Sequence, residues 1–251
     1  HNMHAKDVVN SIQKEKHLFV EKPLAMNETE LLDIKTNYKE ALINGSKLNV
    51  MVGFNRRFAP PIQKVKKLFA KEQAKSITIR VNSGVLPSGH WINDPEIGGG
   101  RVIGEACHFI DLAMFLADSP IISVSADSLE TRTKLNNSVV INLKMKNGSV
   151  ASVNYFANGN KSVQKEFIEV FCDGTIAQIN DFKDLYVFGK KTSKQKYKGQ
   201  NKGHTACVQS FLSSIKHGKE SPIPFEESYL SMLATFKVLQ SISENRKIEI
   251  Q

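Results

Sequence analysis

The chain has 251 residues, of which 41% are hydrophobic and 24% charged, so it can bury a core and lacks the composition of a disordered protein. Its three cysteines lie far apart without a CxxC pair, which argues against a disulfide framework or a zinc ribbon and favours a cytoplasmic protein. No stretch approaches the roughly 20 apolar residues that span a bilayer, and we expect neither a membrane segment nor a secretory signal.

The net charge of +9 is concentrated in one place, because six lysines fall between residues 190 and 202. They alternate with Thr, Ser, Gln and Gly, a pattern typical of a solvated hairpin or loop. No aromatic side chains are interleaved with them as stacking platforms for bases. We therefore expect no nucleic-acid partner.

The first fifty residues alternate helical and extended patterns. The predicted elements are a helix over 5–14, a strand over 17–20, a helix from Asn27 or Thr29 to about 44, and a strand over 48–52. Pro23 ends the first strand because proline cannot donate to a ladder, and Gly45 stops the second helix. Such an alternation with short links predicts a parallel, doubly wound sheet.

This α/β region lacks one expected unit. No strand–GxGxxG–helix segment occurs anywhere in the sequence, and the glycines at 98–104 follow a loop rather than a strand. We therefore interpret residues 1–55 as a partial dinucleotide-binding (Rossmann) domain that lacks the phosphate-binding half.

Residues 56–251 have a different character and predict a second, α+β domain. We expect a basic helix over 62–71, a strand over 76–83 and a helix ending near Leu116. Short strands follow at 122–129, 138–145, 150–156, 166–171, 175–180 and 185–188, then helices at 204–217 and 226–244 and a strand at 247–250. Asn147-Gly148 and Asp173-Gly174 are hairpin turn signals, so the sheet should be large, open and mostly antiparallel.

One stretch concentrates the chemistry. Glycines 98–100 lead into an apolar-periodic segment that carries Glu105, His108 and Asp111, three residues apart and thus on one side of a helix. Glycines allow a ligand to approach the backbone, and histidine is the natural proton carrier near neutral pH. The alternative is a tight loop followed by a helix histidine with an ordinary packing role.

Three segments together resemble the Gfo/Idh/MocA oxidoreductases. They are His17–Ala25 with its Glu21-Lys22-Pro23, Val52–Phe58 with its Gly-Phe-Asn-Arg-Arg, and the glycine–Glu105–His108–Asp111 segment, in the family's order and spacing. The block from Arg80 to Ile97 is similar to a branch in which this module often follows a region like a zinc alcohol dehydrogenase.

The resemblance implies hydride transfer between NAD or NADP and the hydroxyl or keto carbon of a sugar-like substrate. It implies cofactor contacts at Glu21, Lys22 and Pro23, and a homo-oligomer formed through the open sheet. A non-catalytic oligomerising or sugar-binding domain is the alternative, because the phosphate-binding fingerprint is missing.

Lys22 and His108 are the catalytic candidates. A cation at the carboxyl end of a parallel strand can hydrogen-bond a substrate hydroxyl and stabilise an alkoxide, although a surface lysine is the plain alternative. His108 matches the histidine that the family uses as proton acceptor. The family often carries an aspartate four residues earlier, and here that position is Gly104. Glu105 and Asp111 are substrate-site candidates. Asp111 either orients His108, or is a helix carboxylate that faces solvent or forms a salt bridge.

The remaining candidates have open alternatives. Asn55 and Arg56 follow the second strand, where Arg56 binds either a cofactor or substrate anion or an interdomain carboxylate. Trp91 stacks on a sugar ring or simply packs. Glu105-x-x-His108 is half of a di-iron pairing, but no second copy exists, and we expect no metal.

Overall fold

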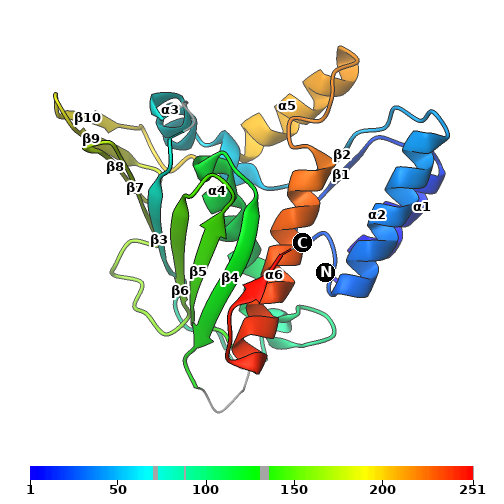
Figure 1. Cartoon of the computed structure of the whole chain (residues 1–251), viewed down its shortest axis with the longest axis horizontal. Coiled ribbons are helices and arrows are strands. Elements are labelled where there is room, and N and C mark those ends of the chain that lie inside the picture. The colour runs from blue at the N-terminus through cyan, green and yellow to red at the C-terminus, as the bar shows by residue number, and fades with distance from the viewer. Residues whose placement is uncertain (70–72, 88, 131–135, 251) are drawn as a thin grey trace.

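The computed structural model describes residues 1–69, 73–87, 89–130 and 136–250 and contains two sheets (Figure 1). The smaller sheet pairs β1 (Leu18–Val20) and β2 (Val50–Val52) in parallel. The helices α1 (His4–Gln13) and α2 (Glu28–Ile43) pack against each other beside it. The predicted α/β alternation of the first fifty residues is therefore confirmed.

The N-terminus of α2 shows how the sequence fixes an element. Asn27, rather than Thr29, is the N-cap, and its side-chain oxygen accepts a hydrogen bond from the backbone N–H of Glu30. The Glu30 carboxylate accepts in turn from the Met26 N–H, so two orphan donors are satisfied. Gly45 follows the helix with φ +86°, a left-handed conformation that glycine adopts without strain.

The larger sheet has nine strands in the order β10-β9-β8-β7-β3-β6-β5-β4-β11. Its strands are β3 (Ser76–Asn82), β4 (Ile121–Ser128), β5 (Val139–Met145), β6 (Val150–Phe156), β7 (Glu166–Cys172), β8 (Thr175–Asn180), β9 (Asp184–Phe188), β10 (Ser193–Lys196) and β11 (Ile248–Glu249). Among the described strands of this sheet, only the central pair, β3 and β6, is parallel. The prediction of a large, mostly antiparallel sheet is confirmed.

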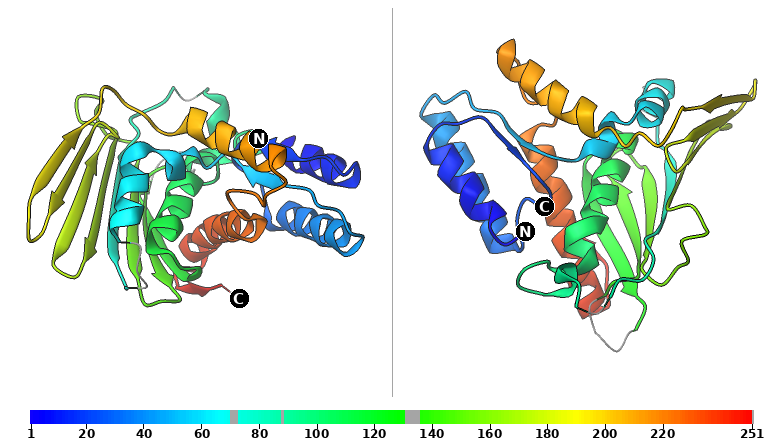
Figure 2. Two further views of the ribbon diagram at one scale, coloured as in Figure 1. Left: turned by 90° about the horizontal axis from the view of Figure 1, so that it is seen from above. Right: turned by 180° about the vertical axis from the view of Figure 1, so that it is seen from behind.

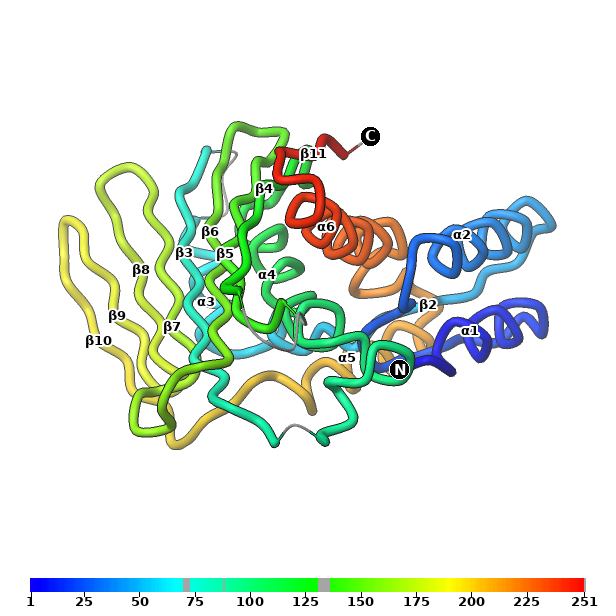
Figure 3. The backbone as a smooth tube through the Cα atoms, turned by 90° about the horizontal axis from the view of Figure 1, so that it is seen from below, coloured from blue at the N-terminus to red at the C-terminus, as the bar shows by residue number. Residues whose placement is uncertain are grey.

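The helices of the second region lie on one side of this sheet (Figure 2). They are α3 (Pro60–Leu68), α4 (Cys107–Ala117) and α6 (Phe225–Glu244), while α5 (His204–Lys216) lies between them and the smaller sheet. Alternate strand residues are buried beneath α4, as the period of two in β5 requires. The other face of the sheet carries no helix from the described part of the chain (Figure 3).

Two hydrophobic cores result, and they meet at α4 and α6. The larger lies between the nine-stranded sheet and the helices above it. The smaller joins α1, α2, β1 and β2 to Phe211 of α5 and to Met232 and Phe236 of α6. Helices α5 and α6, from the second half of the chain, thus complete the core of the first region. The boundary predicted between residues 55 and 56 stays a prediction.

Several predicted boundaries move by a few residues. The helix predicted over 62–71 begins at Pro60, since proline is tolerated in a first turn, and it ends at Leu68; residues 70 and 71 lie outside the described part. The lysines from 190 to 196 lie in the turn and the second strand of the exposed β9–β10 hairpin, whereas Lys202 lies beyond the hairpin and pairs with the buried Glu166. Within the described residues, no helix combines the length and the apolar character needed to cross a bilayer.

Candidate active site between β1 and α4

The glycine-rich loop ends in a π-helical turn, η3 (Val102–Ala106), which runs directly into α4. A π-turn displaces a carbonyl from the regular ladder, and such bulges are frequent at functional sites. Here the Gly104 carbonyl accepts a hydrogen bond from the Lys22 ammonium at 2.7 Å. Lys22 follows β1, so this contact ties the carboxyl end of the small sheet to the start of α4, four residues before His108.

The glycines before η3 have specific steric reasons. A Cβ on Gly98 would lie 2.3 Å from the Ile92 Cα, so no other residue fits there without a backbone shift. Gly99 and Gly100 have φ of +71° and +77°, in the left-handed region that other residues rarely adopt. The glycine run is therefore a structural requirement of the loop that delivers η3.

Glu105 is the second partner of Lys22, at 2.9 Å from Oε1 to Nζ. Burial raises the pKa of this carboxyl, but the cations Lys22, Lys165 and Arg56 together outweigh burial, and the resulting pKa lies below the ordinary value. Glu105 is thus a carboxylate at neutral pH and holds the Lys22 ammonium in place.

His108 lies in the first turn of α4, only 5% exposed, with its ring edge toward Phe54. Burial lowers its pKa well below the ordinary value, and the cations Arg56 and Lys22 lower it further. Its Nδ1 is buried and has no hydrogen-bond partner among the described residues. His108 is therefore a neutral imidazole, and its Nδ1 makes no hydrogen bond to the rest of the described structure.

The position of the family's aspartate, Gly104, is closely packed. A Cβ there would lie 3.0 Å from the His1 ring and 3.1 Å from the Ile92 side chain. The neighbouring Glu105 carboxylate pairs with Lys22, and no hydrogen bond joins it to His108 in the described structure. The substitution therefore leaves His108 without a carboxylate partner from this turn.

Asp111 lies one turn further along α4 and has a different set of partners. Its two oxygens accept from the Arg57 guanidinium at 2.6 and 2.8 Å, and Oδ1 also accepts from the Ser231 hydroxyl at 3.0 Å. Burial opposes the charge on Arg57, but Asp111 and Glu227 outweigh it and raise the Arg57 pKa. These contacts match the salt-bridge alternative, and none of them reaches His108.

Asn55 and Arg56, the predicted cofactor contacts after β2, are engaged in the same way. Asn55 donates from its amide to the Lys202 carbonyl at 2.7 Å. Arg56 forms two bonds of 3.0 Å to Glu166, the first residue of β7, and lies over the Phe109 ring. Lys202 also contacts Glu166. This matches the ion pair between regions that was the alternative for Arg56.

The other predicted residues lie around the lysine. The Glu21 carboxylate is close to Gly53, since a Cβ on that glycine would lie 3.2 Å from both Glu21 oxygens. Pro23 is buried, and its carbonyl accepts from the His4 ring at 2.7 Å. Trp91 is 48% exposed, with its ring against those of His90 and His1.

Two basic residues near the site were not among the sequence candidates. Arg101 follows the glycine run and is 5% exposed, donating to the Tyr155 hydroxyl at 3.0 Å and to the Ser83 hydroxyl. Lys165 immediately precedes β7 and is partly buried. Neither belongs to a motif with a known spacing, so only the folded arrangement could identify them.

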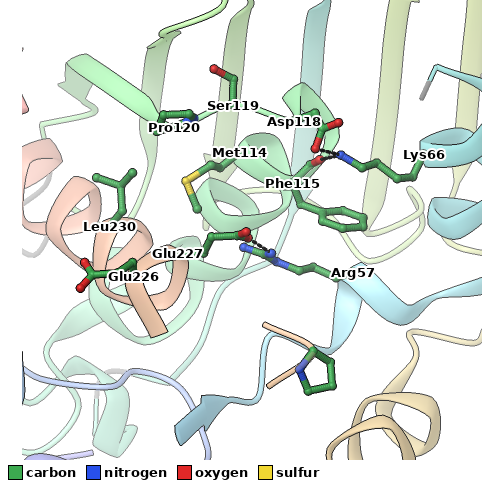
Figure 4. Close-up of a pocket in the computed structure, with 11 residues that line it drawn as sticks. Arg57, Lys66, Met114, Phe115, Asp118, Ser119, Pro120, Glu226, Glu227 and Leu230 are labelled. Atoms are coloured by element: carbon green, nitrogen blue, oxygen red, sulfur yellow. Dashed lines mark hydrogen bonds and ion pairs between the residues drawn. The ribbon is translucent and has the colours of Figure 1, made fainter. Parts of the chain in front are cut away.

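A separate cavity of about 360 Å³ lies at the other end of α4. Figure 4 shows it between the α4 residues Met114 and Phe115 and the α6 residue Leu230, with the Arg57–Glu227 and Lys66–Asp118 pairs at its rim. Its basic groups are already paired. In the described residues no three His, Cys, Asp or Glu side chains gather as a metal site, and all three cysteines are free and buried.

The two-sheet architecture, with a parallel βα region beside a large open sheet, is shared with solved structures of other proteins. An oxidoreductase domain protein from Kribbella flavida matches with a TM-score of 0.86 and 19% identity, covering 100% of this chain and 78% of that one. A levoglucosan dehydrogenase in complex with NADH and levoglucosan matches with a TM-score of 0.85 and 18% identity, covering 99% and 77%.

Sequence comparison agrees with the fold. Residues 63–177 match the family model of the GFO/IDH/MocA C-terminal domain. The myo-inositol 2-dehydrogenase of Thermotoga maritima is 22% identical over 268 residues, an alignment that covers 100% of this chain and 77% of that protein. Residues 63–177 therefore carry a GFO/IDH/MocA C-terminal domain, and the similarity to the Thermotoga maritima protein extends over the whole chain.

Proposed function

We propose that the chain provides the substrate site and part of the cofactor site of an NAD(P)-dependent dehydrogenase acting on a sugar-like alcohol or ketone. The observation that supports this most is the hydrogen bond of the Lys22 ammonium to the Gly104 carbonyl, in the turn that leads into α4 and His108, whose Nδ1 has no partner among the described residues. The family's dehydrogenases, including enzymes named for myo-inositol and levoglucosan, support the same reaction class.

Lys22 has the donor that such a reaction needs. An ammonium has three N–H donors, and the Gly104 carbonyl and the Glu105 carboxylate accept two of them. The third can donate to the oxygen of a substrate hydroxyl. As the carbon loses hydride, negative charge develops on that oxygen, and a fixed cation stabilises it without reorganisation.

His108 accounts for the proton. A base must be unprotonated to accept a proton, and burial together with Arg56 and Lys22 keeps this imidazole neutral at pH 7. In the oxidation, the hydroxyl proton passes to His108, the C–H bond breaks as hydride leaves, and a C=O bond forms. The reduction reverses these steps, with His108 returning the proton.

The chain's residues fit a nicotinamide cofactor at the end of the small sheet. Ligands of open α/β sheets bind beyond the carboxyl ends of parallel strands, where Glu21, Lys22 and Pro23 follow β1. When bound, the cofactor accepts or supplies the hydride. NAD and NADP are equally compatible with these residues.

The test is turnover in a protein that carries a complete dinucleotide-binding domain. Lys22→Ala and His108→Ala should each lower hydride transfer by about 10²-fold or more, because each removes a group that acts in the transition state. Lys47→Ala and His217→Ala, at exposed positions, serve as matched controls. Near-normal turnover in either test variant would remove that residue from the mechanism.

We also propose that the uncovered face of the large sheet pairs with a second copy of the chain. By register, Val150, Phe171 and Phe188 lie along one row of this face, and each is 37–44% exposed. Exposed apolar rows of this kind are typical of interfaces. This surface is also the feature that favours the alternative, a non-catalytic oligomerising domain.

The oligomer is tested by light scattering after gel filtration. Phe171→Glu places a charge in the row and should convert an oligomer to monomers. Val163→Glu, on an exposed loop, should leave the mass unchanged. A wild-type monomer at high protein concentration would contradict the proposal.

A further inference from the structure

The surroundings of His108 contain more positive than negative charge. The basic groups that act on His108 are Arg56, Lys22, His204 and Lys165, and the nearby carboxylates, Glu105 and Glu166, bind Lys22, Arg56 and Lys202. Arg101 lies beyond them against Tyr155. These groups come from β1, η1 (Asn55–Phe58), the glycine loop, the start of β7, the loop before α5 and the first residue of α5. Charges placed together in a partly buried region interact strongly, so the excess requires an explanation.

Both carboxylates are already committed to other cations. Glu105 accepts from Lys22, and Glu166, fully buried, accepts two bonds from Arg56 and one from Lys202. Neither Arg101 nor Lys165 forms an ion pair with a carboxylate within the described residues. The uncompensated charge therefore lies on the side of the site that faces the large sheet.

Arg101 shows how costly this arrangement is. Its guanidinium is buried, and its partners are neutral oxygens: the Ser83 and Tyr155 hydroxyls and the Gly84 carbonyl at 3.3 Å. Its Nε has no hydrogen-bond partner in the described structure. A buried cation is normally paired with an anion, because desolvation disfavours an isolated charge.

Lys165 is the cation best placed to meet a ligand. Its backbone carbonyl is fixed by the Asn82 N–H at 2.7 Å, while its ammonium has no hydrogen bond or ion pair in the described part of the chain. Burial lowers the Lys165 pKa, the carboxylates of Glu105 and Glu166 oppose this, and Lys202 and Arg56 add to the lowering. An amine that is partly desolvated near other cations gains from binding an anion.

We propose that the substrate carries an anionic group, a carboxylate or a phosphate on a sugar, and that Lys165 binds this group. The inference rests on the proposed function, in which the reacting hydroxyl lies between Lys22 and His108. The cofactor's own phosphates are an unsuitable occupant, because Lys165 precedes β7 of the large sheet and its backbone carbonyl accepts from Asn82 at the end of β3. The cofactor's side of the site is the end of β1 in the small sheet, which Lys22 follows.

The test is binding of charged and neutral sugars to the full chain, measured by saturation-transfer NMR titration. D-Glucuronate or D-glucose 6-phosphate should bind at least tenfold more tightly than D-glucose, and whichever of the two gains identifies a carboxylate or a phosphate as the group. Lys165→Met should remove the preference, Lys165→Arg should retain most of it, and Lys146→Met, at the opposite end of the sheet, should not change it.

Equal affinities for charged and neutral sugars, or a preference that survives in Lys165→Met, would overturn the proposal. These outcomes are separable from the failure of the proposed function, because binding is measured without turnover. A charge preference with normal turnover in Lys22→Ala and His108→Ala would leave the anion site standing and remove the dehydrogenase mechanism. Loss of turnover without a charge preference would do the reverse.

Discussion

Two polar clusters lie about one turn apart on α4, and they differ in how completely their groups are paired. Around Asp111, both carboxylate oxygens accept hydrogen bonds from Arg57, and Ser231 adds another. Around His108, the ring nitrogen Nδ1 has no partner among the described residues, and nearby cations exceed carboxylates. The first cluster is a closed ion-pair network, and the second has unused capacity for a ligand.

How completely a polar group is hydrogen-bonded distinguishes a structural residue from a candidate functional residue better than the residue type does. Buried polar groups are nearly always satisfied, so an unsatisfied one needs a specific reason. Asp111 and His108 lie on the same side of the same helix and were indistinguishable as candidates by spacing. Their partners show that Asp111 joins α4 to η1 and α6, whereas the buried Nδ1 of His108 has no partner among the described residues.

The largest expected effect tests the closed cluster. Asp111→Asn removes the counter-charge of a buried guanidinium and should cost about 3–5 kcal/mol of unfolding free energy. Glu105→Gln makes the same chemical change at a side chain that is 23% exposed, and should cost about 1 kcal/mol or less. Urea unfolding of both variants measures the difference, and equal costs would contradict the distinction between the clusters.

A smaller expected loss of stability, on α6, tests the same distinction between paired and unpaired groups. Ser231→Ala removes a hydrogen bond to a carboxylate and should cost about 1.5 kcal/mol. Ser228→Ala, one turn away and equally buried, removes a hydroxyl whose oxygen has no partner in the described structure, and should cost close to zero. Thermal or urea unfolding compares the two, and a larger loss for Ser228→Ala would show that the network is wrongly described.

The fold could be predicted well from the sequence because it depends on local signals. Asn27, Gly45 and the Asn147-Gly148 turn act within a few residues, and the strand alternation of β5 fixes which face is buried. Lys22 and His108 could be selected through the family resemblance. The π-turn whose Gly104 carbonyl accepts from Lys22 has no spacing signal of its own.

The partners of the other candidates depend on contacts between distant parts of the chain. Arg56 meets Glu166 across 110 positions, and Asp111 meets Ser231 across 120. No local pattern specifies such pairs, so the alternatives for Arg56 and Asp111 had to stay open. Arg101 and Lys165 were missed for the same reason, since their significance comes from the carboxylates they lack.

The central claim is that His108 is held neutral, with capacity to accept a proton, beside the Lys22 ammonium. Nitrogen NMR of histidine-labelled protein, with His108→Gln used to assign its signals, measures this directly. We predict that the His108 ring is neutral at pH 7 and stays so well below its ordinary pKa of 6.5, because burial and the cations Arg56 and Lys22 disfavour the imidazolium. A ring that titrates at 6.5 or higher would contradict the account.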